Sequence, residues 1–168
     1  MIDSKELTKL NKKLDKIAEK LWKAGIKGGG GSGMDANTIP GAVNRELFQG
    51  ANKIRNTIIL SMRNTPQTGR KYRRGKSGGF HIASSPGNPP AIDFGELLRS
   101  IVYDVRDMEV EIGNEAGAPY GGFLEEGTKK MEARPWLDPA VKEHQDEIIN
   151  NIGNVVFETI RHSFEGIS

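Results

Sequence analysis

The chain contains few residues whose types and spacing could support catalysis. Cysteine is absent, which excludes thiol nucleophiles, disulfides, iron–sulfur clusters and thiolate zinc sites. The three histidines are His81, His144 and His162, and none of them lies at the spacing of a metal-binding pair. Glu125 and Glu126 are adjacent, so on a helix they point in different directions, and no nucleophile with an oriented base accompanies them. The sequence therefore predicts no enzymatic activity, no metal and no cofactor.

Two short strings imitate motifs of nucleotide chemistry. Gly75-Lys76-Ser77 is similar to the end of a phosphate-binding loop, but Arg70 stands where the motif requires its first glycine. Asp93-Phe94-Gly95 matches the metal-binding triplet of protein kinases, but the catalytic-loop sequence that should precede it is absent. We interpret both strings as coincidences.

A basic run is the strongest charge feature of the chain. With an aromatic residue in its middle, such a run can contact phosphates while Tyr72 stacks on a base, so a small nucleic-acid-binding protein is one interpretation. No recognition helix or repeated aromatic platform accompanies the run, which favours the alternative of a solvated loop. That loop would meet acidic surfaces such as Glu109 and Glu111 on a neighbouring subunit. The possible phosphate contacts are Arg70, Lys71, Arg73, Arg74 and Lys76.

Length and charge place the chain among soluble proteins of one domain with an appendage. It has 168 residues and a net charge of +2. Residues 1–33 carry eight lysines and four acidic residues, whereas residues 34–168 carry 16 basic and 18 acidic residues. The basicity therefore belongs to the leading segment and gives little support to a nucleic-acid partner of the main body. No apolar run approaches the roughly 20 residues that span a bilayer, so we expect an intracellular protein without a membrane partner.

A glycine-rich run divides the sequence into two parts. Residues 28–33 contain only glycine and one serine, so no side chain there can pack, and Met34 follows directly. This composition is typical of an engineered flexible linker, and a natural glycine-rich loop is the alternative. We therefore expect a fused segment over residues 1–27 and an independent domain over residues 34–168.

The leading segment has the pattern of an amphipathic helix. Asp3 and Glu6 stand at capping-box spacing, and lysines fill the face opposite an apolar seam. Because a lone helix of about 20 residues is marginal in water, the seam is expected to dock in a groove or on another helix. The segment is either a docking helix from a partner protein or the first helix of this domain. The seam consists of Leu7, Leu10, Leu14, Ile17 and Leu21.

The remaining residues predict an α+β fold, in which a small antiparallel sheet packs with two long amphipathic helices and the leading helix stays separate. The first long helix begins at Asn37 or Thr38 and must stop before Pro66. Residues 65–95 are rich in glycine and proline and predict a long loop with at most one strand, over residues 80–83. The apolar face of the first helix is expected to contain Val43, Leu47, Ala51, Ile54, Ile58 and Met62.

Alternation dominates the next segment. After a short helical turn over residues 96–99, apolar and charged residues alternate from Ile101 to Ile112, which predicts a half-exposed hairpin with its turn at Arg106-Asp107. A short helix over residues 120–126 ends at Gly127, an extended piece covers residues 130–133, and Asp138 begins the second long helix. The buried stripe of that helix is expected to contain Val141, Ile148, Ile152, Val155, Thr159 and Ile160.

Three strings taken together resemble a known family. They are Pro66-Gln67-Thr68-Gly69, residues 83–101 and residues 119–140, and the most specific part is Glu126-Gly127-Thr128 followed by Ala133-Arg134-Pro135-Trp136. Their order resembles the tail-completion and neck proteins of long-tailed bacteriophages, which are minor head–tail morphogenesis proteins. The resemblance covers about residues 66–140, with compatible helices on both sides.

The resemblance implies a structural role in a virion. Subunits would assemble in the host cytoplasm into a ring, a hexamer, at the head-proximal end of the tail, and would contact neighbouring neck or tail proteins. The loop over residues 69–91 and the turn over residues 127–136 are the expected contact elements. Trp136 would anchor such a contact, or it is a plain core tryptophan. The candidate subunit contacts are Tyr72, Phe80, Pro86, Pro89, Phe123, Met131, Arg134 and Trp136.

The resemblance also bears on the leading helix. The family-like architecture is complete from Met34 onward, so the helix would come from another phage or host protein that docks on the ring subunit. Some relatives begin with a leucine-patterned helix, which leaves its origin open.

Overall fold

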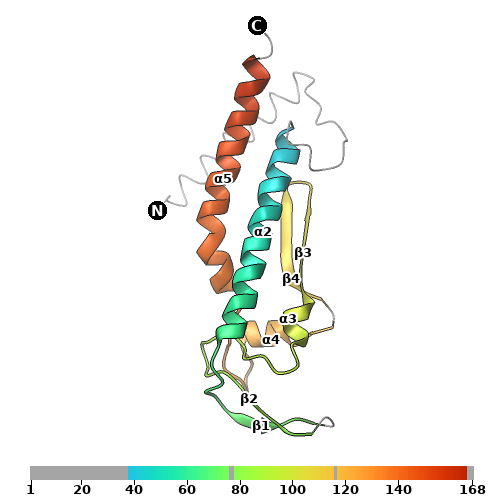
Figure 1. The fold of residues 1–168 in the computed structure, drawn as a ribbon, viewed down its shortest axis with the longest axis vertical. Helices are drawn as coiled ribbons and strands as arrows, with labels where there is room; N and C mark the ends of the chain where they lie inside the picture. Colours follow the sequence, from blue (N-terminus) through green and yellow to red (C-terminus); the bar gives the residue numbers. More distant parts are fainter. Residues whose placement is uncertain (1–37, 76–77, 116, 166–168) are drawn as a thin grey trace. The chain divides into compact units, whose positions relative to one another are not determined.

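The fold is α+β, as the sequence predicts, with helices and small antiparallel sheets (Figure 1). The computed structural model describes residues 38–75, 78–115 and 117–165. For residues 164 and 165 it describes the backbone alone. The predicted leading helix with its seam, the linker and Lys76 lie outside the described residues.

Helix α2 (Ile39–Asn64) ends before Pro66 as its sequence predicts, and it begins one residue after Thr38, the later of the two predicted starts. Thr38 is the N-cap, and its hydroxyl accepts a hydrogen bond from the amide of Gly41 at 3.2 Å, while Pro40 occupies the first turn. The helix ends where Thr65 turns extended ahead of Pro66. All six predicted apolar positions of this helix are buried, which confirms the predicted face.

Helix α5 (Asp138–Glu165) lies antiparallel to α2 (Figure 1). A Cβ on Gly50 would lie 2.6 Å from the side chain of Ile148, so the glycine permits the close approach of the two helices. Thr57 hydrogen-bonds to the imidazole of His144 at 2.7 Å, and Lys53 forms an ion pair with Glu147. The predicted stripe of α5 is only half-buried, because within the described residues α2 is its main neighbour and covers one side.

The strands form two separate two-stranded sheets instead of one small sheet. Strand β1 (Lys71–Arg73) pairs antiparallel with β2 (Phe80–Ile82), with Tyr72 opposite His81. The loop over residues 65–95 therefore contains two strands, and the prediction of at most one strand was wrong. Gly78 and Gly79 both have positive φ, a conformation that glycine adopts without strain and that helps the chain return on itself.

The second sheet is the predicted hairpin of β3 (Ile101–Arg106) and β4 (Glu109–Asn114). Its turn lies at Asp107-Met108, one residue later than predicted, and both residues have positive φ. The amide of Met108 donates to the side-chain oxygen of the buried Asn44 at 2.9 Å, which fixes the hairpin tip beside the start of α2. This long-range hydrogen bond favours the observed turn position, and no local sequence pattern predicts the bond.

Two short helices complete the fold. Helix α3 (Glu96–Ser100) matches the predicted helical turn, and α4 (Gly121–Glu126) ends at Gly127 as predicted. Residue 130 lies in a tight turn that is closed by a bridge between Thr128 and Met131, so the predicted extended piece begins later than expected. The principal core cluster contains Ile54, Ile58, Met62, Leu97, Ile101, Ala118, Trp136 and Ala140.

Candidate functional site

A groove of about 650 Å³ lies beside the end of α2, where most elements of the fold meet. Its wall comes from the end of α2, from β1 and β2, from the segment that leads into α3, and from the residues around α4. The polar or ionisable side chains of the wall include Tyr72, His81, Ser84, Asp93, Tyr120 and Arg134.

The three strings of the family resemblance converge at this groove. Gly69 of the first string donates its amide hydrogen bond to the carbonyl of Ala83 at 2.7 Å, and Gly87 of the second string donates to the carbonyl of Ala133 at 2.9 Å. Arg134 of the third string donates through Nε to the carbonyl of Ser84 at 3.2 Å. The three strings are apart in the sequence, and in the fold they are joined by hydrogen bonds to backbone carbonyl groups.

Glycine is required at the first of these contacts. A Cβ on Gly69 would overlap the carbonyl oxygen of Ser84. Ser84 is itself fully buried, and its hydroxyl has no hydrogen-bond partner among the described residues. Ser84, His81 and Asp93 thus share one groove, but the serine makes no hydrogen bond to the histidine. The arrangement therefore lacks the hydrogen-bonded relay that activates a serine nucleophile.

His81 and Asp93 anchor the β1–β2 hairpin. His81 is only 5% exposed, and its Nδ1 lies 3.5 Å from Oδ1 of Asp93. Arg74 donates through Nε to the same carboxylate oxygen at 2.7 Å, and its guanidinium lies 4.8 Å from the centroid of the Phe94 ring. The ring of Tyr72 packs edge-on against His81 with 5.2 Å between centroids. Asp93, which the sequence places in a kinase-like triplet, here binds an arginine and a histidine of the same chain.

The two groove tyrosines keep their protons at neutral pH. Burial raises the pKa of Tyr72 above its usual value, and the negative charge of Asp93 raises it further. Burial likewise raises the pKa of Tyr120, with Glu96 as the next cause. Both hydroxyls therefore stay neutral over the physiological pH range and keep a proton that can be donated in a hydrogen bond.

Glu125 has a role that the sequence did not reveal. Its carboxylate accepts backbone hydrogen bonds from Trp136 at 2.7 Å and from Leu137 and Asp138 at 2.9 Å each. These amides lie at or just before the start of α5, so Glu125 caps that helix from another helix. Gly127 follows with a φ of 77°, and a Cβ there would meet the amide nitrogen of Ala133 at 2.8 Å.

The candidate subunit contacts differ in their exposure. Phe80 is 58% exposed and Phe123 is 61% exposed, whereas Trp136 is 3% exposed and donates through Nε1 to the carbonyl of Gly121 at 3.1 Å. Trp136 is therefore a core residue of this chain, which was the second of its two interpretations. Pro86 is exposed, and the other candidates are partly exposed or at the groove: Tyr72, Pro89, Met131 and Arg134.

The basic run is divided by the fold. Arg70, Lys71 and Arg73 are exposed and form no ion pair with any described residue, while Lys71 lies 4.5 Å from the centroid of the Phe80 ring. Arg74 is held by Asp93 and is not a free phosphate contact. Lys76 lies outside the described residues.

Comparison with known proteins adds no relative. No family model, no curated protein and no solved structure matches the chain. Within the described part, no group of three acidic or histidine side chains is placed to hold a metal ion. No helix of that part is long and apolar enough to cross a bilayer.

Proposed function

We propose that the chain is a structural assembly protein that works by contact with copies of itself and with neighbouring virion proteins, and that catalyses no reaction. In this proposal it is a tail-completion or neck component that forms a ring, a hexamer, at the head-proximal end of a bacteriophage tail. The class of protein comes from the family resemblance of residues 66–140. The observation that carries the proposal is the exposure of large apolar side chains over the described fold.

These side chains occur on both long helices and on all four strands. Large apolar side chains that are exposed in a single copy can be covered by contact with another macromolecule. The half-buried stripe of α5 belongs to the same pattern, since α2 is the main neighbour of this 28-residue helix within the described residues and covers one side of it. The most exposed members are Leu60, Phe80, Phe94, Phe123 and Phe157.

The two sheets support the same proposal. A sheet of two strands is marginal by itself, and each of the two leaves both of its edges without a strand partner among the described residues. A neighbouring copy can extend or cover such a sheet. The expected partners are other copies of this chain, neighbouring neck or tail proteins, and the source protein of the leading helix.

The oligomeric state of the full chain tests the proposal. Light scattering after gel filtration should give one discrete oligomer, and negative-stain images should show annular particles. A chain that stays monomeric across the accessible concentration range would contradict the proposal. Turnover of a small-molecule substrate would contradict it independently.

A nucleic-acid-binding protein is the second candidate function. The observation that favours it is the exposure of Arg70, Lys71 and Arg73 beside the exposed ring of Phe80. Such a protein should shift short DNA at low salt and lose the shift in the variant R70E/R73E. Arg74 is left unchanged in this variant because its loss would release Asp93 and disturb the groove. No shift for the unmodified chain at low salt would dismiss this candidate.

A further inference from the structure

The β1–β2 hairpin has one face that is basic and, among the described residues, largely exposed. Its register places Arg73 opposite Phe80 and Lys71 opposite Ile82, so these four side chains share a face. The opposite face carries Tyr72 and His81, which pack at the groove. We call the face that carries Lys71, Arg73, Phe80 and Ile82 the basic face. Its two cations and Phe80 are exposed.

The β3–β4 hairpin has an outer face of opposite charge. The cross-strand pairs on this face are Val102 with Gly113, Asp104 with Glu111, and Arg106 with Glu109. We call these six residues the acidic face. Tyr103 and Ile112 lie on the other side of the sheet, and Ile112 packs against the core. The acidic face therefore points away from the apolar interior.

The acidic face has carboxylates in excess. Asp104 and Glu111 stand directly opposite each other, and like charges in a cross-strand pair are destabilising. Arg106 forms its ion pair with Asp104. Glu109 and Glu111 are exposed and form no ion pair with a described residue. Arg106 compensates the charge of Asp104, and a cation from outside would compensate the charges of Glu109 and Glu111.

The acidic face also has room for an aromatic ring. A shallow depression of about 550 Å³ is lined by Val102, Asp104, Glu111 and Gly113, among others. A Cβ built on Gly113 would meet no atom within 4 Å. The glycine thus leaves open space beside the exposed Val102, on a strand flanked by carboxylates. An apolar side chain between two cations, as on the basic face, complements this surface.

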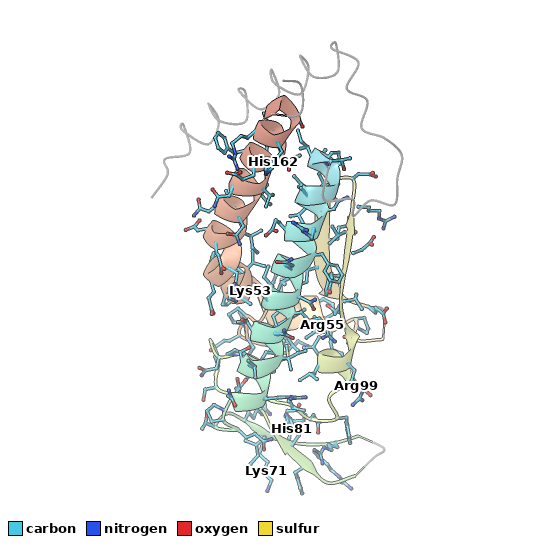
Figure 2. All side chains as sticks on the ribbon, turned by 45° about the horizontal axis from the view of Figure 1, so that its top comes forward. Lys53, Arg55, Lys71, His81, Arg99 and His162 are labelled. Atoms are coloured by element: carbon cyan, nitrogen blue, oxygen red, sulfur yellow. The ribbon has the colours of Figure 1, made fainter. Side chains whose placement is uncertain are left out.

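The two faces belong to hairpins at different parts of the fold. The tip of the β3–β4 hairpin is bound to Asn44 near the start of α2, whereas the β1–β2 hairpin follows the end of that helix, about 30 Å from Asn44 at 1.5 Å per residue (Figure 1). The basic face also points away from its own groove, and in Figure 2 Lys71 lies at the outer edge of the hairpin while His81 lies toward α2.

We propose that the basic face of one copy docks on the acidic face of the next copy. Lys71 and Arg73 would meet Glu109 and Glu111, and Phe80 would fill the space above Gly113. Because the contact joins two different surfaces, it repeats head to tail and closes into a ring when the rotation between copies permits. The inference rests on the proposed function and adds the surface through which copies recognise each other.

A charge-swap experiment on the full chain tests this contact. The variant K71E/R73E reverses the basic face, and the variant E109K/E111K reverses the acidic face. Each variant alone should assemble about a hundredfold more weakly than the unmodified chain, since each close charge pair lost corresponds to about a tenfold change. Sedimentation velocity or light scattering over a concentration series measures the change.

An equimolar mixture of the two variants should restore the oligomer. In the mixture each reversed basic face meets a reversed acidic face, and each unmodified basic face meets an unmodified acidic face. The restored oligomer should contain both variants in equal amounts, which mass spectrometry of the intact particle reports.

Matched controls carry the same charge changes elsewhere. R45E/R63E and E126K/D146K change exposed residues outside both faces and outside the expected contact elements, and none of these residues forms an ion pair with a described residue. Each control variant should assemble like the unmodified chain. Circular dichroism should show that all four variants are folded.

The outcomes separate this inference from the proposed function. Normal assembly of folded K71E/R73E, or a mixture that remains monomeric, would overturn the docking of these two faces while the assembly role stands. A monomeric unmodified chain would overturn both.

Discussion

Replacing Glu125 should destabilise the protein far more than replacing its neighbour Glu126. The carboxylate of Glu125 accepts hydrogen bonds from three backbone amides at the start of α5, at 2.7 Å from Trp136 and at 2.9 Å from Leu137 and Asp138. A charged acceptor contributes at most about 1.5–3 kcal/mol for each such bond. Asp138 is exposed, so its freed amide can bond to water, and the loss at this site is correspondingly smaller.

We expect E125A to lower the free energy of unfolding by about 2–3 kcal/mol, somewhat more than the loss of an ordinary helix cap. E125Q keeps a neutral acceptor but loses the favourable interaction of its charge with the helix N-terminus, so the loss should be about 1 kcal/mol. E126A serves as the matched control, because Glu126 is exposed and forms no ion pair with a described residue, and its effect should stay within about 0.5 kcal/mol.

Urea unfolding followed by circular dichroism at 222 nm measures these differences. The variants are compared at equal protein concentration, and the comparison is repeated at a second concentration so that assembly does not enter the difference. Equal stability of E125A and E126A would refute the capping role. In that case the three bonds would contribute no more than the water bonds that replace them.

Three further perturbations test other parts of the description. G69A should destabilise the protein by about 3 kcal/mol, because the added Cβ overlaps a backbone carbonyl oxygen, whereas the same change at Gly75 meets open space and should be nearly neutral in thermal unfolding. Lys53 lowers the pKa of Glu147, so their ion pair stabilises the folded state above pH 4.5 and is lost as the pH falls through the lowered pKa. The unfolding curves of K53M and the unmodified chain should differ near neutral pH and converge in acid, and a constant difference would refute the pair. Deletion of residues 1–33 should leave a folded chain that still assembles, and aggregation or unfolding of the shortened chain would show that the leading helix belongs to the core.

The parts of the fold that the sequence predicts are those with local causes. Thr38 and Pro66 limit α2 from within a few residues of its ends, and strict alternation makes the β3–β4 hairpin visible. The position of the hairpin turn was missed by one residue, because a hydrogen bond to Asn44, 64 residues away in the chain, favours the observed turn.

The groove was beyond prediction for the same reason. The pairing of Tyr72 with His81 depends on a glycine-rich turn between the two strands. The sequence from Gly69 to Gly79 shows no alternation of apolar and polar residues that would predict β1. The sequence places Asp93 in a kinase-like triplet and Glu125 next to a second glutamate, yet the fold uses both carboxylates as acceptors for distant parts of the chain. A carboxylate that binds backbone or arginine far away in the sequence leaves no local signal, so its role emerges only from the three-dimensional structure.

The construction of the groove also explains how the basic face can be presented to a partner. Two strands of three residues are too short to hold an orientation by their own hydrogen bonds. Contacts of the inner face, from His81 to Asp93 and from Arg74 to the same carboxylate, attach the β1–β2 hairpin to the rest of the fold. Because these contacts use only the inner face and one cation, Lys71 and Arg73 stay exposed on the other side and form no ion pair with a described residue. The interior of the groove therefore acts as a positioning device for the surface that we propose as the contact between copies.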